Sequence, residues 1–166
     1  SVIVYSGAGD DILTGGAAND IIHGGAGDDT ITGNGGTDAL YGEEGDDLFL
    51  VANSVDFPNS SLMPETIDGG EGNYVLEFTD DEDDSYLPGQ LSGLRSVEVI
   101  AFSGTGNDSV TLSDKFYQQN ALTQPGLIIA SDAAAGSLYV DAKSVTLGAI
   151  GIYANLVDGV NDTLLG

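Results

Sequence analysis

The sequence contains no cysteine and only 3 Lys plus Arg residues against 27 Asp plus Glu residues. Without cysteine, a disulfide framework and thiolate metal sites are both excluded. The formal net charge of -24 at pH 7 argues against nucleic acid and anionic membranes as partners, because both require basic side chains that replace their counterions. Long apolar runs are also missing: no stretch approaches the roughly 18 residues of a membrane helix, and no signal-peptide pattern opens the chain.

The remaining composition is that of a folded protein. Hydrophobic residues make up 41% and charged residues 18% of the 166 residues, which is typical of one globular domain and not of an acidic disordered chain. The carboxylates therefore need compensation that Lys and Arg cannot supply. Metal cations are the plausible source, and hard oxygen ligands favour calcium.

Glycine accounts for 25 residues, about twice its ordinary share of roughly 7%. Many of these glycines belong to a nine-residue repeat that fills residues 6–50 without a gap, as SGAGDDILT, GGAANDIIH, GGAGDDTIT, GNGGTDALY and GEEGDDLFL. Residues 2–5 fit the end of a preceding unit, so we expect the chain to be a segment of a longer array. Position 6 is always Asp and position 8 always apolar, and these residues are Asp11, Asp20, Asp29, Asp38 and Asp47, and Leu13, Ile22, Ile31, Leu40 and Phe49.

Each unit combines a turn with a strand. Positions 1 to 6 carry glycines that tolerate positive φ, and positions 7 to 9 suit a short strand with one inward apolar side chain. Two units then complete one coil of eighteen residues. The repeat predicts an all-β fold, a right-handed parallel β-roll or β-solenoid, with position 8 forming its core.

The same period predicts metal sites. Turns on one edge are eighteen residues apart and bring their Asp carboxylates within about 4.8 Å of each other. Such close like charges cannot both stay ionised without a cation between them. We therefore expect several calcium ions, held by Asp11 with Asp29, Asp29 with Asp47, and Asp20 with Asp38. Backbone carbonyls of the turns should complete the shells, with the exact oxygens left open, and the candidates are Gly7, Gly9, Gly16, Gly25 and Gly27.

The nonapeptide pattern G-G-x-G-x-D, followed by a strand with an apolar centre, resembles the calcium-binding repeat of the RTX (repeats-in-toxin) family. The resemblance implies a parallel β-roll folded by calcium. It also implies a protein exported by Gram-negative or cyanobacterial cells, often by type I secretion. Three units depart from the pattern, with Ala18 in place of a turn glycine, Asn34 and Gly35 in the fourth unit, and Glu43 at position 2 of the fifth.

We divide the chain into the repeats at 1–50 and a continuation of the solenoid at 51–166, with longer, irregular turns, in one body. Pieces of the repeat return there. Residues 69–77 keep the glycine turn but have Tyr74 at position 6, and 103–111 form a complete unit whose Asp108 is a further candidate metal ligand. Residues 157–165 keep Asp162, and 51–68 are expected to be a coil that has lost the motif.

The second half also predicts individual elements. Further strands are expected at 96–102, 127–130, 137–140 and 144–152, and a short helix at 114–121 with Ser113 as its N-cap. The segment 91–108 is similar to regions of RTX surface-layer proteins and large adhesins. The acidic run at 79–85 is interpreted as a solvated loop rather than a specific calcium site.

Catalysis finds no support in the sequence, so we expect a protein that is not an enzyme. His23 should be a solvated strand residue, no Ser lies in a G-x-S-x-G motif, and acids that recur with the repeat indicate ligands rather than one catalytic pair. Ile12, Ile21 and Leu48 are apolar at the outward position 7. They meet either another segment of this chain, which we favour, or a partner protein.

We therefore expect a calcium-binding module that gives calcium-dependent folding and stability to a secreted or cell-surface bacterial protein. Two alternatives stay open. One is an interaction module of a surface layer or adhesin, with self-association or a cell-surface partner. The other is an accessory domain of a secreted protease, lipase or alginate epimerase.

Overall fold

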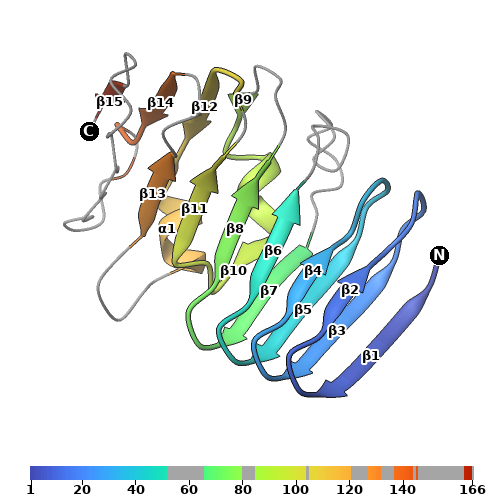
Figure 1. The fold of residues 1–166 in the computed structure, drawn as a ribbon. Helices are drawn as coiled ribbons and strands as arrows, with labels where there is room; N and C mark the ends of the chain where they lie inside the picture. Colours follow the sequence, from blue (N-terminus) through green and yellow to red (C-terminus); the bar gives the residue numbers. More distant parts are fainter. Residues whose placement is uncertain are drawn as a thin grey trace.

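The computed structural model describes residues 1–51, 66–79, 85–103, 105–120, 127–131, 137–143, 145 and 163–165. This part of the chain is nearly all β, and its strand pairs are parallel (Figure 1). Helical structure is limited to a 3-10 turn, η1 (Gln90–Gly93), and one short helix, α1 (Asp114–Gln119). Neither helix is long and apolar enough to cross a membrane, and the same holds for the whole described part of the chain.

Two sheets stack face to face, and the chain alternates between them (Figure 1). Within the repeats, the register between neighbouring strands is eighteen residues, for example Ile22 beside Leu40 and Leu13 beside Ile31. The coil of two nonapeptides is therefore confirmed. Sheet A consists of β1 (Ile3–Ala8), β3 (Ile21–Ala26), β5 (Ala39–Glu44), β7 (Thr66–Glu71) and β10 (Leu94–Arg95), and sheet B of β2 (Ile12–Thr14), β4 (Thr30–Thr32), β6 (Leu48–Val51), β8 (Val75–Phe78), β11 (Val99–Phe102) and β13 (Ile128–Ser131).

The position 8 side chains form the core between the two sheets. Ile22 and Leu40 point inward from sheet A, and Ile31 and Phe49 point inward from sheet B, all four buried. Leu13 packs against the same core but is only partly buried, because its coil is the first one described and has a neighbour on one side. The predicted ladder is thus two ladders, one in each sheet, that meet in one core.

The prediction of a full coil at 51–68 is wrong. The register rises from 18 to 27 residues there, with Leu40 beside Ile67 and Phe49 beside Leu76. A complete extra coil would add a strand to each sheet, but sheet B passes directly from β6 to β8. No additional coil therefore lies between these strands, and β7 continues sheet A directly after β5, whereas residues 52–65 lie outside the described residues.

A third sheet appears beyond Phe78. It contains Tyr86, and the Tyr86 ring packs on Phe78 and Phe102 with centroids 4.2 and 5.9 Å apart, which fills the junction with sheet B. The strands predicted around 96–102, 127–130 and 137–140 are present as β11, β13 and β14, whereas 144–152 lies outside the described residues apart from Val145. Sheet C consists of β9 (Ser85–Tyr86), β12 (Asp108–Thr111), β14 (Leu138–Asp141) and β15 (Thr163–Leu165).

Helix α1 begins where the sequence predicted and ends earlier. The Ser113 hydroxyl accepts the N–H of Phe116 at 3.2 Å, as an N-cap should. The helix ends at Gln119 because the Asn120 side chain is held by β10 and the residues that follow it: its Nδ2 donates to Leu94 O at 3.2 Å and its Oδ1 accepts Val97 N–H at 3.1 Å. The predicted extension to residue 121 is therefore wrong by at least one residue, since Asn120 has left helical geometry.

Candidate metal sites between stacked turns

The turns are shaped by residues with positive φ at positions 2 and 4 of the repeat. In the third unit these are Gly25 and Gly27, with φ of 112° and 125°. A Cβ atom on Gly25 would collide with the carbonyl oxygen of Gly7 in the preceding coil, so stacking itself requires glycine there. Glu43 nevertheless adopts φ of 80° at position 2, and Asn34 adopts 64°, so the fourth and fifth units keep the left-handed turn conformation. In the second unit neither Gly16 nor Ala18 has a positive φ, so its turn differs from the others.

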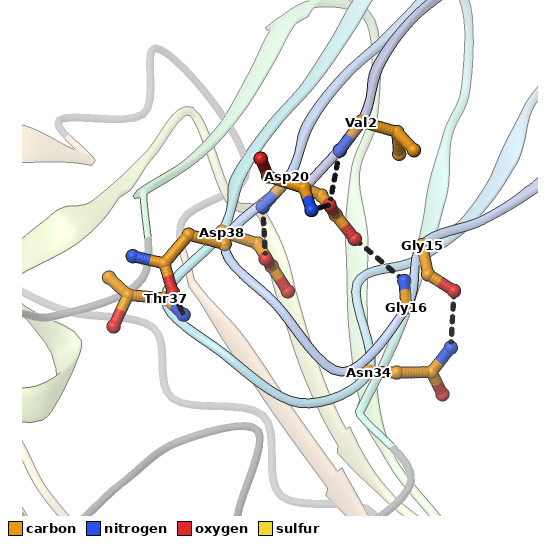
Figure 2. Close-up of polar contacts among 9 residues, drawn as sticks. Val2, Gly15, Gly16, Asp20, Asn34, Thr37 and Asp38 are labelled. Carbon is orange, nitrogen blue, oxygen red and sulfur yellow. Dashed lines mark hydrogen bonds and ion pairs between the residues drawn. The ribbon is translucent and has the colours of Figure 1, made fainter.

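The position 6 carboxylates form ladders along both edges of the roll. On one edge, Oδ1 of Asp29 accepts the N–H of Asp11 at 2.8 Å, and Oδ1 of Asp47 accepts the N–H of Asp29 at 2.9 Å. On the other edge, Oδ1 of Asp38 accepts the N–H of Asp20 at 2.7 Å (Figure 2). The structure therefore brings together the three pairs that the eighteen-residue coil predicted.

Asp20 lies in a different environment from the other ladder residues. Its carboxylate accepts the N–H of Gly16 at 2.6 Å and the N–H of Val2 at 2.7 Å (Figure 2). These two backbone donors hold the pKa of Asp20 below its ordinary value. Backbone hydrogen bonds thus compensate part of the charge at this first turn of its edge.

Asp29 and Asp47 have less compensation. Each residue is 1% exposed, and the Oδ2 atom of each is buried without a hydrogen-bond partner. Burial raises the pKa of Asp47, and the neighbouring carboxylates, with Asp29 first among them, raise it further. A buried carboxylate oxygen that lacks a donor is costly, so this edge of the roll provides negative charge that a cation would neutralise.

Backbone carbonyls face the same gaps between turns. The gap between the turns of residues 24–29 and 42–47 is an example. The Gly27 carbonyl oxygen of the first turn points toward the second, because a Cβ atom placed on Gly45 would collide with it. The Gly42 carbonyl oxygen of the second turn points toward the first, and lies 2.9 Å from the position that a Cβ atom on Gly24 would take. One gap is thus lined by Gly27 O, Gly42 O and the carboxylates of Asp29 and Asp47. Such a set of hard oxygens fits calcium.

The predicted carbonyl ligands fare differently. Gly7, Gly9 and Gly27 direct their oxygens toward the following coil, whereas the contacts of Gly16 and Gly25 do not decide where their oxygens point, so these two stay predictions. In the described part of the chain, no three Asp, Glu or His side chains come together as a metal-binding group. An ion in these gaps would therefore need backbone oxygens beside its two carboxylates.

A second ladder, at position 5, was missed from the sequence. Oδ1 of Asp10 accepts the N–H of Asp28 at 3.0 Å, and Oδ1 of Asp28 accepts the N–H of Asp46 at 2.9 Å. This exposed ladder runs opposite to the buried one, because here the side chain belongs to the earlier coil. The signal was in the sequence: position 5 of the first five units holds Asp, Asn or Thr, all of which can accept hydrogen bonds.

Glu98 was also missed. Its Oε2 accepts the N–H of Tyr74 at 2.8 Å, so the buried ladder, which is interrupted at Tyr74, resumes in the next coil, and burial raises the pKa of Glu98. Its three-residue pattern, an acid two positions before the buried Ile100, matches Asp47 before Phe49. By contrast, Asp108 lies at the start of β12 in sheet C and belongs to neither ladder. Asp162 and residues 80–84 lie outside the described residues.

The outward-facing side chains of the first coils are partly uncovered. His23 lies on sheet A between Tyr5 and Tyr41, with ring centroids 4.5 and 4.7 Å away, and its Nδ1 is 2.7 Å from Oε1 of Glu43. Ile12 is 85% exposed, so the favoured interpretation that another segment of this chain covers it is wrong. His23 is therefore a structural residue of the strand, packed between two tyrosine rings.

Comparison with protein families agrees with this geometry. Residues 3–31 and 14–49 match a family model that holds four copies of the RTX calcium-binding nonapeptide repeat. Residues 3–49 therefore carry RTX calcium-binding nonapeptide repeats. RTX repeats are calcium-binding, so this segment, called the RTX array below, is a calcium-binding module. No curated protein and no solved structure matches the chain.

Proposed function

We propose that the RTX array makes folding and stability of this protein dependent on calcium, and that it does so in a secreted or cell-surface bacterial protein. The observation that carries the proposal is the pair of buried Oδ2 atoms of Asp29 and Asp47, which have no hydrogen-bond partner. Such atoms destabilise the stacked turns unless a cation lies near them. Calcium would therefore stabilise the folded array and have little effect on the unfolded chain.

In this proposal each gap between same-edge turns holds one ion. Two carboxylates supply the charge, and the carbonyl oxygens of the glycine turns fill the remaining positions, as at Gly27 and Gly42. The chain carries 27 acids and 3 Lys plus Arg residues, so bound ions also reduce the repulsion that opposes a compact state. We expect the coils to be right-handed, because parallel crossover connections almost always are.

The proposed location follows from calcium supply and from the family. RTX repeats typically occur in secreted bacterial proteins. At a cytosolic calcium concentration of about 10⁻⁷ M, sites with dissociation constants near 10⁻⁴ M would stay empty, and they would fill at about 10⁻³ M outside the cell. The chain would then stay unfolded for export, by a type I system, and fold outside. It acts as a structural module without catalysis of its own.

Isothermal titration calorimetry with calcium tests this function directly. The native chain should bind several ions, and Asp29→Ala should bind fewer, because Asp29 borders two gaps. Asp28→Ala is the matched control, since its carboxylate belongs to the exposed ladder and should leave the number of ions unchanged. Equal stoichiometry in all three proteins would contradict the assignment of Asp29.

A second candidate function is an interaction module, as in a surface layer or adhesin. The observation that favours it is a group of exposed apolar side chains on the first coil. Ile12 is 85% exposed, Tyr5 is 73% exposed, and Ile3 is exposed as well. Exposed apolar side chains of this size suit a protein contact. Calcium-dependent self-association, followed by light scattering, would support this function, and a monomer at all calcium concentrations would argue against self-association.

A further inference from the structure

Tyr74 occupies the position 6 site of its turn, where the preceding turns have aspartate. In turn 42–47, a Cβ on Gly42 would collide with Oδ2 of Asp47, so the carboxylate lies over that glycine. In turn 69–74, a Cβ on Gly69 would collide instead with the ring of Tyr74. The fully buried phenol ring therefore fills the space that the carboxylate has in the turn before it.

The Tyr74 hydroxyl reaches into the gap between turns 42–47 and 69–74. It donates a hydrogen bond to the carbonyl oxygen of Glu43 at 3.2 Å. It also lies 3.1 Å from the Cβ position of Gly72, which the carbonyl oxygen of Gly45 approaches as well. The gap is thus lined by carbonyls of turn 42–47, as the preceding gap is, but a phenol hydroxyl is now among them.

The other side of the gap is also built like a metal site. The Gly69 carbonyl oxygen lies 2.7 Å from the Cβ position of Gly42, and the buried Oδ2 of Asp47 has no hydrogen-bond partner. Every component of the preceding gap is therefore repeated here except the second aspartate. Tyr74 has no carboxylate that could accept the N–H of Asp47 or bind an ion.

We propose that Tyr74 takes the place of a cation in this gap and so sets where the ion-binding part of the roll ends. Its hydroxyl proton satisfies the Glu43 carbonyl, and its ring excludes both an ion and water from the space over Gly69. The inference rests on the proposed calcium binding in the preceding gaps. It adds that the site in this gap is lost because of one residue, Tyr74, although the glycine turn is still present.

The chain already contains what a restored site would need. Glu98 accepts the N–H of Tyr74 at 2.8 Å, which is the bond that Asp47 makes to Asp29 two coils earlier. A carboxylate at position 74 could accept the N–H of Asp47 in the same way. It would then face Asp47 across the gap, with the carbonyls of Glu43, Gly45 and Gly69 around it.

The experiment is to count bound calcium ions by native mass spectrometry and calorimetry in the native chain, Tyr74→Asp and Tyr74→Asn. Tyr74→Asp should bind one ion more than the native chain. Tyr74→Asn should not, because asparagine has the shape of aspartate but lacks its charge. Equal counts in the native chain and Tyr74→Asp would overturn the inference while leaving the proposed function intact. If the native chain binds no calcium, the proposed function fails, and a gain of one ion in Tyr74→Asp would still support the role of Tyr74.

Tyr74→Phe provides a test that does not depend on folding of the aspartate variant. It keeps the ring and removes only the hydroxyl that bonds to Glu43 O. We expect the ion count of the native chain and a lower unfolding midpoint in calcium, because the Glu43 carbonyl, whose hydrogen bond is partly buried, loses its donor. Loss of one ion in Tyr74→Phe would show that the hydroxyl is a calcium ligand and would overturn the inference.

Discussion

Oδ1 of Asp47 accepts the backbone N–H of Asp29 at 2.9 Å, while Oδ2 of the same carboxylate is buried without a donor. One oxygen therefore connects two coils, and the other is available for a cation in the gap between them. The ladder hydrogen bond needs an acceptor at this position but no charge, whereas the ion needs the charge. These two roles can be separated by experiment.

Replacing Asp47 with Asn should change stability in opposite directions with and without calcium. An amide oxygen can still accept the Asp29 N–H, so the ladder bond is retained. In calcium, Asp47→Asn should unfold at a lower temperature because the ion loses a ligand. In chelator the variant should be more structured than the native chain, because a buried uncompensated charge is gone. A destabilised variant under both conditions would contradict this separation of roles.

The same charge predicts a pH dependence of the calcium-free chain. The pKa of Asp47 is raised in the folded state by burial and by neighbouring carboxylates, so protonation favours folding. In chelator, β structure should increase as the pH falls from neutrality toward 3.8, the ordinary aspartate value, and should be lost as the pH rises again. Far-ultraviolet circular dichroism measures this, and Asp47→Asn should show a smaller change with pH.

Calcium should convert a largely unfolded chain into a folded one. With a dissociation constant of about 10⁻⁴ M and calcium at about 10⁻³ M, each site adds roughly 1.4 kcal/mol, so the three aspartate-paired gaps add on the order of 4 kcal/mol. That approaches the lower end of a whole domain's stability, about 5 to 15 kcal/mol. Circular dichroism in chelator and in millimolar calcium should differ strongly. An unchanged β spectrum in chelator would mean that ions bind to a fold that already exists.

Asp29→Ala should be the most damaging change of a single acid. Asp29 lies between Asp11 and Asp47 and borders two gaps, so its loss removes a ladder hydrogen bond and weakens two ion sites, about 4 kcal/mol in total at millimolar calcium. Asp28→Ala removes one exposed acceptor, worth about 1 kcal/mol. Chemical unfolding in calcium compares the two, and equal losses would show that burial and the second gap contribute nothing.

Ile31→Asp should abolish folding even in saturating calcium. Ile31 is fully buried in β4, and a carboxylate there without a partner costs several kcal/mol, against a domain stability of about 5 to 15 kcal/mol. Thr32→Asp, on the outward side of the same strand, is the control and should still fold. Cooperative unfolding retained in Ile31→Asp would show that position 8 is not core.

The sequence by itself determined the repeating part of this protein. A fixed period carrying glycine, aspartate and an apolar residue leaves one way to stack, so the eighteen-residue register, the core at Ile31 and the Asp29–Asp47 pairing follow from the repeat alone. Local sequence sufficed because each contact in the array joins equivalent positions of similar units.

Where the period breaks, the arrangement of the strands follows only from the tertiary structure. The 27-residue register between β5 and β7, the third sheet and the early end of α1 at Gln119 depend on which segments pack together, and no local pattern encodes that choice. The role of Glu98 is of the same kind. It enters the buried ladder only because β11 lies beside β8, so that its carboxylate meets the backbone of Tyr74, 24 residues earlier in the chain.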